Sequence, residues 1–194
     1  MPNPSRVLCT SWSSTLRLPK STFPPRISAA DRAALLKKCT DDLYSWQRHQ
    51  RTSDNAFILH DGPPYANGSL HIGHALNKIL KDIICRFQLS QGKRINFVPG
   101  WDCHGLPIEL KALQRQRKLG DSTLIDDTYV DVDASTVRTI ARELANRTVE
   151  EQRQGFKEWG VMGNWEGAWR TMDHDFEIRQ LAVFKCMVGK GRLL

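Results

Sequence analysis

The sequence predicts an α/β domain built on a parallel sheet, with helical segments before and after it. Two short apolar runs, at residues 56–60 and 95–98, have the length and the turn-forming flanks of buried strands. Between the two runs, apolar residues recur at helical spacing from residue 76 to residue 87. A strand, a helix and a second strand in this order form a right-handed crossover, which makes the two strands parallel.

A first amphipathic helix is predicted from about residue 29 to about residue 48. Ser28 and Asp31 form a capping-box pattern at its start. Its buried face is predicted to consist of the apolar residues that recur at helical spacing, which are Leu35, Leu36, Cys39, Leu43 and Trp46. The polar segment that follows ends the helix before the first strand.

A loop rich in glycine and proline joins the first strand to the central helix. Residues 61–69 read Asp-Gly-Pro-Pro-Tyr-Ala-Asn-Gly-Ser, and these residue types disfavour both helix and strand. In the helix that follows, we expect an apolar stripe to pack against the sheet or another helix. The stripe consists of Leu76, Ile79, Leu80, Ile83, Ile84 and Phe87. The opposite, solvent-facing side is expected to carry Asn77, Lys78, Lys81 and Asp82.

The second half of the chain is predicted to be mostly helical. Residues 120–133 carry five aspartates without a strong period and are expected to form a surface loop. Ser135 is a candidate cap for a long helix with Val137, Ile140, Ala141 and Leu144 on one face. A final helix is predicted over residues 175–188.

The composition indicates a protein without membrane spans that can attract polyanions. The 194 residues carry 28 Lys and Arg against 21 Asp and Glu, a net charge of +7. Nucleotides, RNA and anionic surfaces suit this charge, although on charge alone a basic solvated face is the favoured explanation. No apolar run approaches the roughly 18 residues that a membrane helix needs. Five widely spaced cysteines without a Cys-x-x-Cys pair argue against a disulfide framework and against a zinc site.

The densest cluster of polar and glycine residues includes His71 and His74 at the start of the central helix. Unpaired backbone amides and the helix dipole favour an anion such as phosphate at that position. A neutral imidazole can donate to a phosphate oxygen, and Gly73 lets a flat ring approach the backbone. The alternatives are a half-formed metal site, for which no third ligand is evident, and ordinary surface histidines. The cluster predicts a nucleotide site whose histidines stabilise charge on a phosphoryl group.

A second cluster, residues 99–109, follows the second strand. If the strands are parallel, Asp102 lies near the two histidines and can hold a substrate ammonium group. Its alternative role is that of a turn carboxylate that caps Gly105 or a neighbour. Cys103 and His104 are adjacent on an extended segment and point to opposite faces, so we expect no nucleophile–base dyad.

These two clusters resemble a known enzyme family. His71-Ile72-Gly73-His74 is similar to the HIGH signature of class I aminoacyl-tRNA synthetases, which related nucleotidyltransferases share. The flanking strings His-Asp-Gly-Pro-Pro-Tyr-Ala-Asn-Gly at 60–68 and Gly-Trp-Asp-Cys-His-Gly-Leu-Pro-Ile-Glu at 100–109 resemble isoleucyl-tRNA synthetases. The resemblance covers about residues 15–194.

The resemblance implies the first half of a Rossmann-like catalytic domain. It further implies ATP-dependent activation of isoleucine, transfer to tRNA(Ile), Mg²⁺ accompanying the ATP, no metal held by the protein, no membrane partner and a monomer at full length. By the same resemblance, His71 and His74 are the catalytic residues. Gly73, Asn67 and Gly68 would bind ATP, and Gly62, Pro63 and Asp102 would bind the amino acid.

The resemblance also divides the chain. Residues 1–14, rich in Ser and Thr and free of acidic residues, are a possible mitochondrial transit leader. Residues 15–55 would form a helical lead-in, and residues 56–194 the N-terminal half of the catalytic domain, truncated before the editing insertion. The sequence contains no Lys-Met-Ser-Lys-Ser-like loop, editing insertion or anticodon-binding domain, which implies a fragment that is inactive alone. The expected location is the mitochondrial matrix, with the cytoplasm as the alternative.

Two other functions fit the sequence. The charge of +7 and the missing half of the site are compatible with a non-catalytic module that binds nucleotide or RNA. The HIGH-type segment is also compatible with a small nucleotidyltransferase that is complete as it stands and forms an adenylate by itself.

Overall fold

The computed structural model of the chain describes Thr22 and residues 26–118 and 133–192. The predicted leader at residues 1–14 and almost all of the predicted acidic loop at 120–133 lie outside the described residues. The chain divides into two compact units, residues 1–34 and residues 35–194. The described helices are α2 (Ala29–Lys37), a π-helical turn (Lys38–Asp42), α3 (Leu43–Gln50), a 3₁₀ turn (Ser53–Asn55), α4 (Ile72–Ser90), α5 (Leu106–Lys118), α6 (Ala134–Glu158) and α7 (His174–Gly189). The strands are β1 (Ala56–His60), β2 (Arg94–Val98), β3 (Gly100–Trp101) and β4 (Trp169–Arg170).

In the first unit, the predicted capping box is present at the start of α2. The hydroxyl of Ser28 accepts the backbone N–H of Asp31 at 3.1 Å, and it donates to the Asp31 carboxylate at 2.7 Å. This cap satisfies an N–H group that the first helical turn leaves without a partner.

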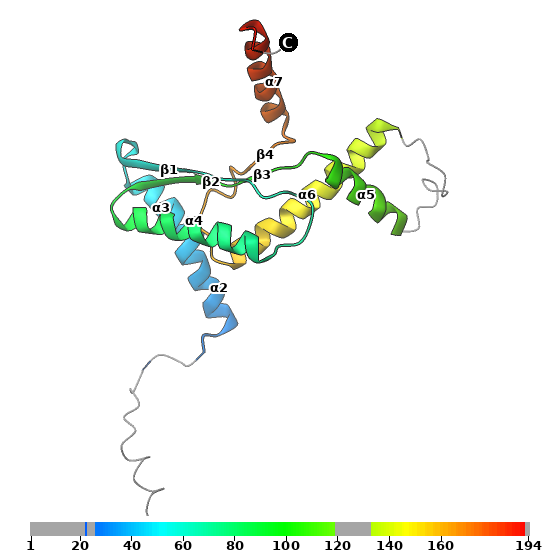
Figure 1. Cartoon of the computed structure of the whole chain (residues 1–194). Helices are drawn as coiled ribbons and strands as arrows, with labels where there is room; N and C mark the ends of the chain where they lie inside the picture. The colour runs from blue at the N-terminus through cyan, green and yellow to red at the C-terminus, as the bar shows by residue number, and fades with distance from the viewer. Residues whose placement is uncertain (1–21, 23–25, 119–132, 193–194) are drawn as a thin grey trace, which may run out of the picture. The chain divides into compact units, whose positions relative to one another are not determined.

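The second unit contains the predicted β1–α4–β2 crossover (Figure 1). Strands β1 and β2 are parallel and in full register, with Ala56 opposite Arg94 and His60 opposite Val98. A second parallel pair, β3 and β4, joins Gly100 to Trp169 and Trp101 to Arg170. The crossover brings the loop after β1 and the segment after β2 to the same edge of the sheet, where ligands bind in open α/β sheets.

Helix α3 covers one edge of β2 with two buried polar side chains. Gln47 exchanges hydrogen bonds with the backbone of Ile95, donating to its carbonyl at 3.0 Å and accepting its N–H at 2.8 Å. The Tyr44 hydroxyl donates to the carbonyl of Phe97 at 3.2 Å and accepts its N–H at 3.3 Å. These side chains therefore replace a neighbouring strand.

The predicted buried face of the first helix is confirmed only in part, because Leu36 and Leu43 are half buried and Leu43 packs against the core. The residues that the structure buries are Thr40, Tyr44 and Gln47, whereas Trp46 is half exposed, and Leu35 and Cys39 face solvent. The physical reason is that the unpaired edge of β2 attracts hydrogen-bonding side chains, and apolar spacing alone does not reveal this demand.

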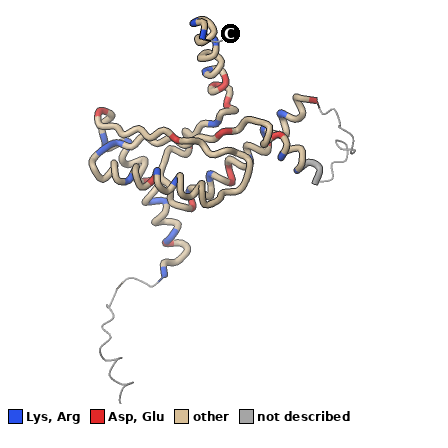
Figure 2. Tube along the Cα trace, in the orientation of Figure 1, with Lys and Arg blue, Asp and Glu red and all other residues tan. Residues whose placement is uncertain are grey.

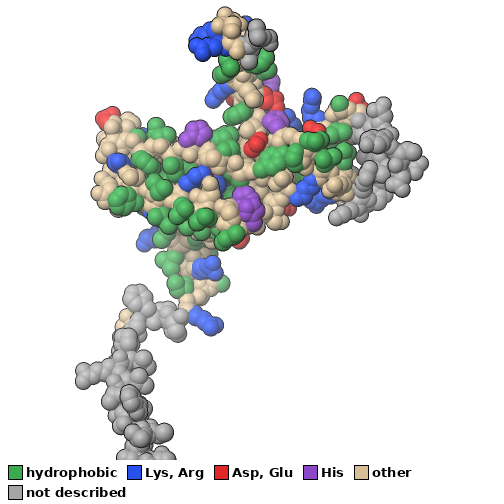
Figure 3. All heavy atoms as spheres, in the orientation of Figure 1, with side chains coloured by type: hydrophobic (Ala, Val, Ile, Leu, Met, Phe, Trp, Pro, Cys, Tyr) green, Lys and Arg blue, Asp and Glu red, His purple; other side chains and the backbone are tan. Residues whose placement is uncertain are grey.

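Helix α4 has the opposite orientation to the one predicted. All six residues of its apolar stripe are between 40% and 62% exposed. The helix instead buries Lys78, Asp82, Cys85 and Leu89. In the space-filling view, hydrophobic side chains accordingly lie along the surface of α4 (Figure 3). The expectation that Lys78 and Asp82 face solvent was wrong. Both charges have partners inside the protein, and these interactions offset the free-energy cost of removing the charges from water.

The partners of Asp82 lie on two elements. Its carboxylate accepts from Arg86 Nε at 2.6 Å and from the backbone N–H of Met162 at 2.8 Å. Arg86 continues this network to the carbonyl of Gly160 at 2.9 Å. The polar side of α4 is thus attached to the segment that follows α6.

Helix α6 supplies much of the core. Leu144, Ala145, Val149 and Phe156 are buried on it, while Val137, Ile140 and Ala141 are half buried, which confirms the predicted face. The cap is Asp133, whose side chain accepts the backbone N–H of Ser135 at 3.1 Å, so the prediction of Ser135 as the cap was wrong. Asp133 lies one residue before the helix, in the position that lets its carboxylate turn back onto the first amides.

Besides the stripe of α4, two further surfaces of the unit carry uncovered apolar side chains in the described structure. The outward side of β1 exposes Ala56, Ile58 and His60, with Ile58 at 70%. Helix α7 buries no residue along its length. The Lys and Arg residues are distributed along the described trace (Figure 2). No described helix combines the length and apolar character that a membrane crossing requires.

Candidate active site

His71 caps the N-terminus of α4 and forms a pair with His74. The Nδ1 atom of His71 accepts the backbone N–H of Gly73 at 3.1 Å. In return, His74 Nδ1 accepts the backbone N–H of His71 at 3.3 Å, so that the two histidines form a reciprocal capping box. The ring centroids are 3.9 Å apart. Both rings therefore lie at the positive end of the helix dipole, as predicted.

The capping contacts indicate the tautomer that each ring has when it is neutral. An imidazole nitrogen that accepts a hydrogen bond carries no proton, so the proton of each neutral ring is on Nε2. Partial burial lowers the pKa of His74, and the nearby His71 and Lys78 lower it further. Each ring can thus present an Nε2–H donor to an anion that approaches the helix end.

The backbone of Gly73 lies so close to the ring of His71 that there is little room for a side chain. A Cβ at this position would lie 2.9 Å from Cε1 and 3.0 Å from Nδ1 of His71. The sequence predicts that a flat ring approaches the backbone here, and in the structure that ring is the imidazole of His71.

The loop after β1 and the segment after β2 are joined directly. Tyr65 and Asp102 form a parallel β-bridge. The N–H of Ala66 donates to the Asp102 carbonyl at 2.8 Å, and the N–H of Asp102 donates to the Pro64 carbonyl at 2.9 Å. The two predicted clusters are therefore adjacent, as the parallel strands require.

The carboxylate of Asp102 does not bond to either histidine. It accepts from the Thr171 hydroxyl at 3.3 Å and from the His104 backbone N–H at 3.5 Å. The second distance is long, so its predicted alternative as a turn cap is only weakly realised. The carboxylate is half buried and retains lone pairs for a cationic ligand.

A buried ion cluster fixes the start of the loop. Asp61, directly after β1, is paired with Lys78 and, at 2.8 Å, with Lys81. The same carboxylate accepts the backbone N–H of Gly100 at 3.2 Å. Burial lowers the pKa of Lys78, although the Asp61 charge opposes this. The ammonium of Lys78 also lies 5.1 Å from the centroid of Phe156. Asp61 therefore links β1, α4 and the start of β3.

The other predicted ligand-binding residues lie along the same loop. Gly62 is exposed and Pro63 half buried, next to Asp61. The backbone carbonyl of Asn67 accepts a hydrogen bond from Lys111 Nζ. The carbonyl of Gly68 accepts from Gln152 Nε2 at 2.7 Å, so this end of the loop is held from α5 and α6.

Sequence reasoning missed Asp61, Lys78 and Gln152 as residues that hold the loops. The signal for Gln152 is present in the sequence, because Leu144, Thr148, Gln152 and Phe156 follow one another at intervals of four and all four are buried. Two polar residues on the apolar stripe of a helix indicate buried hydrogen-bonding partners.

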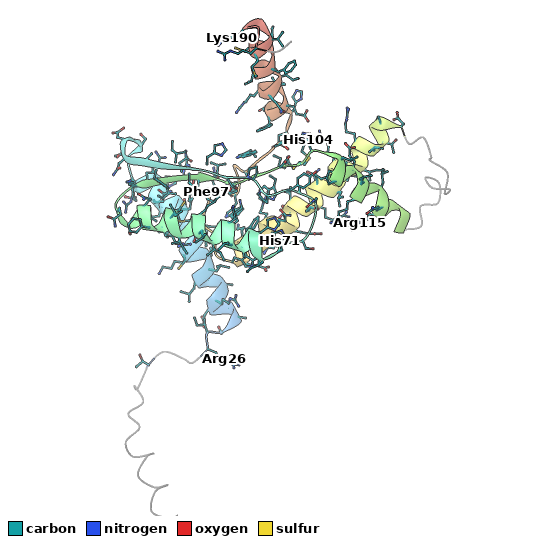
Figure 4. The ribbon with its side chains drawn as sticks, viewed as in Figure 1. Arg26, His71, Phe97, His104, Arg115 and Lys190 are labelled. Atoms are coloured by element: carbon teal, nitrogen blue, oxygen red, sulfur yellow. The ribbon has the colours of Figure 1, made fainter. Side chains whose placement is uncertain are left out.

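Cys103 and His104 form no dyad. Cys103 is buried, and burial raises the pKa of its thiol to about 12. His104 is exposed, and its Nε2 lies 3.0 Å from the Thr171 carbonyl (Figure 4). The two side chains differ in exposure and bond to different carbonyls, so the expectation that they form no dyad is confirmed.

A cavity of about 530 Å³ lies beside this segment, between α5, α6 and the start of α7. Its lining includes His104, Arg138 and Arg142 with Glu109 and Glu177, so it carries charges of both signs. His71, His74 and Asp102 do not line it. Among the described residues, no group of three or more His, Cys, Asp or Glu could hold a metal ion.

Comparison with known proteins decides the family. The family model for tRNA synthetases class I (I, L, M and V) matches residues 35–194. The chain belongs to this family. The class I synthetase sequence is 48% identical over 93% of its length to an isoleucine–tRNA ligase of Gloeobacter violaceus. It is 44% identical to a probable mitochondrial isoleucine–tRNA ligase of Dictyostelium discoideum and 44% identical to a mitochondrial one of Schizosaccharomyces pombe, over 93% and 92% of the chain.

The chain spans only a small part of each relative's own length. The share is 18% for the Gloeobacter violaceus protein, 16% for the Dictyostelium discoideum protein and 17% for the Schizosaccharomyces pombe protein. Among solved structures, the chain is similar to LeuRS of Agrobacterium radiobacter K84, crystallised as a ternary complex with tRNA and LeuAMS. The TM-score is 0.59 at 22% identity, over 82% of this chain and 17% of that one. Together with the family model, this likeness confirms the predicted fold, a part of the class I synthetase catalytic domain.

Proposed function

We propose that this chain contributes to a site that activates isoleucine with ATP and transfers it to tRNA(Ile). The observation that carries the proposal is the pair of imidazoles of His71 and His74 at the positive end of α4, each with Nδ1 bonded to a backbone N–H so that Nε2 can donate to an anion. The loop before that pair is bridged to Asp102, so groups suited to a phosphate and to an ammonium lie on adjoining segments.

In the activation step, a carboxylate oxygen of isoleucine attacks the α-phosphorus of ATP. A new P–O bond forms, the bond to the β-phosphate breaks, and pyrophosphate leaves. Charge develops on the phosphoryl oxygens, which donors at a helix N-terminus stabilise. His71 and His74 act as hydrogen-bond donors here and transfer no proton. Gly73, Asn67 and Gly68 would lie along the nucleotide, and Mg²⁺ would accompany the triphosphate.

The amino acid would be held by residues of both segments, Asp102 after β2 and the start of the loop after β1. The carboxylate of Asp102 binds the ammonium group through a charge-assisted hydrogen bond, and Gly62 and Pro63 form part of the wall for the side chain. The relatives named isoleucine–tRNA ligases support isoleucine as the substrate. Two of these relatives are named as mitochondrial proteins, which supports the mitochondrial matrix as the location of this chain.

The complete site requires more polypeptide than these 194 residues. The relatives are more than five times longer than the region they share with this chain. Parallel sheets are covered on both faces in folded proteins, whereas here the outer side of β1 and the stripe of α4 are open. We assign residues 1–14 to a leader, 15–55 to a lead-in and 56–194 to the first half of a catalytic domain. Further segments would cover the open surfaces, and the full-length product would act as a monomer.

Isoleucine-dependent ATP–pyrophosphate exchange tests the proposal. The complete gene product should catalyse exchange with isoleucine, and His74→Ala should abolish it. His49→Ala is the control, because His49 is an exposed histidine on α3 whose contact is to the Ser45 carbonyl. Unchanged exchange in His74→Ala would refute the role of that residue. Salt-dependent tRNA binding without exchange would favour the RNA-binding module instead.

A further inference from the structure

Gln152 connects the two halves of the candidate site from a third element. It lies on α6, is 1% exposed, and its Oε1 accepts the indole Nε1–H of Trp101 at 3.0 Å. Its Nε2 donates to the carbonyl of Tyr65 at 3.2 Å and to that of Gly68 at 2.7 Å. The three hydrogen bonds of this amide therefore all run to the two segments, and none of them runs to its own helix.

The amide has a single workable orientation. Reversing it would place its N–H group against the indole N–H and its oxygen against two carbonyl oxygens. In the observed orientation both N–H groups and the oxygen have partners. A saturated, buried amide is rigid, because any rotation leaves a polar group without a hydrogen bond.

A second contact seats the same loop on the same helix. A Cβ at Gly155, three residues beyond Gln152, would overlap the side chain of Leu70. Leu70 directly precedes His71, so α6 holds the loop at Tyr65, at Gly68 and again just before the histidine pair. Phe156 extends this contact, since its ring centroid lies 6.5 Å from that of His74.

We infer that Gln152 is a positioning residue that sets the distance between the ATP side and the amino-acid side of the site. This inference rests on the function proposed above. On one side its amide holds the loop that carries Asn67 and Gly68. On the other it holds Trp101, whose neighbour Asp102 would bind the ammonium group. Adenylate formation requires the two substrates to meet in one geometry, and a displacement of about 1 Å can cost on the order of 100-fold in rate.

Thr148 provides a matched control on the same helix face. It is also buried, but its hydroxyl donates only to the carbonyl of Leu144, within α6. Thr148→Val removes a buried hydrogen bond without touching either loop. Gln152→Met keeps the length and volume of the side chain and removes all three bonds.

The experiment compares the two variants in the complete gene product. The unfolding temperature of each variant is measured, and the assay is run well below both temperatures. Under these conditions Gln152→Met should lower kcat for isoleucine-dependent exchange about 10- to 100-fold. Thr148→Val should retain the wild-type kcat. Equal kcat values in the two variants would overturn the inference. Absence of exchange by the wild-type product would overturn the proposed function, and this inference with it.

Gln152→Glu serves if the methionine variant does not fold. An ionised carboxylate still accepts from Trp101 but cannot donate to Tyr65 or Gly68. The KM for ATP should then rise more than the KM for isoleucine, and the defect should shrink as the pH falls, because a protonated carboxyl can donate again. Equal increases in both KM values, without a pH effect, would contradict the assignment.

Discussion

The imidazole of His71 occupies the space that a side chain at Gly73 would need. The ring accepts the backbone N–H of Gly73 at 3.1 Å, and a Cβ on that residue would approach it to 2.9 Å. The tightness of this contact makes the phosphate end of the proposed site sensitive to a single methyl group.

Gly73→Ala should therefore lower exchange activity without lowering the unfolding temperature. Alanine is favoured over glycine within a helix by about 0.5–1 kcal/mol, which offsets the displacement of an exposed ring. Exchange assays and thermal unfolding of the same preparation check both parts. Gly189→Ala, at a helical glycine with no neighbour within 4 Å, is the control. Full activity in Gly73→Ala would show that the position of the His71 ring is unimportant.

His74 should titrate below the ordinary histidine pKa of about 6.5. Partial burial lowers its pKa, and the charges of His71 and Lys78 act in the same direction. The folded chain then binds this proton less readily than the unfolded chain does. The stability contributed by neutral His74 is fully present above pH 6.5, and it is lost as the pH falls through the lowered value.

NMR titration of the ring protons measures this pKa directly. Replacing His71 by alanine should raise the pKa of His74, because one repelling charge is removed. His49→Ala should leave it unchanged. A His74 that titrates at or above 6.5 would contradict the burial described for it.

Asp61→Asn should destabilise the fold strongly. The substitution leaves the ammonium of Lys78 buried without its charged partner, and breaking such a pair costs about 3–5 kcal/mol. Denaturant unfolding of the 194-residue chain measures the loss. Asp42→Asn, in an exposed pair with Lys37, should leave the midpoint almost unchanged.

The double variant Asp61→Asn with Lys78→Met tests the cause. Removing the stranded charge should recover part of the stability, because methionine is apolar and similar in length. A double variant less stable than Asp61→Asn alone would show that Lys78 contributes mainly through the rings of Phe97 and Phe156.

Ile83→Lys should behave differently in the short chain and in the complete gene product. Ile83 is 56% exposed on the apolar stripe of α4. In the 194-residue chain, the substitution should reduce binding of a hydrophobic dye and leave the unfolding temperature unchanged. In the complete product it should lower that temperature, because the proposed further segments would bury the new charge.

The control is Lys185→Ala on α7, a helix with no buried residue. Equal unfolding temperatures for wild type and Ile83→Lys in the complete product would show that the stripe stays uncovered there.

Sequence patterns predicted the elements better than they predicted the faces. The bounds of β1, the parallel pairing and the histidines at the start of α4 follow from turn residues and from the crossover rule, which are local or topological constraints. The buried side of α4 could not be predicted, because apolar spacing does not show which charges find buried partners. Lys78 pairs with Asp61, 17 residues away in sequence, and Asp82 accepts from the backbone of Met162, 80 residues away.

The candidate site divides in the same way. Gly73 and the reciprocal cap of His71 and His74 lie within four residues of one another, so the motif alone indicates them. A sequence motif cannot indicate the role of Gln152, because the partners of its side chain lie on two other segments. Only the spacing of polar residues along a buried helix face signals that such partners exist.

The large sequence separation between Gln152 and its partners also affects how the chain folds while it is being synthesised. The bonds of Gln152 span 87 residues to Tyr65, 84 to Gly68 and 51 to Trp101. The β1–α4–β2 crossover leaves the ribosome first, and the loop at its edge lacks its amide partner until α6 has been made. At translation rates of about 5–20 residues per second, that delay is roughly 4–17 seconds. During this interval the carbonyls of Tyr65 and Gly68 lack the partner that holds them in the folded chain, and in variants of Gln152 they never gain it, so such variants should also lower the yield of folded protein.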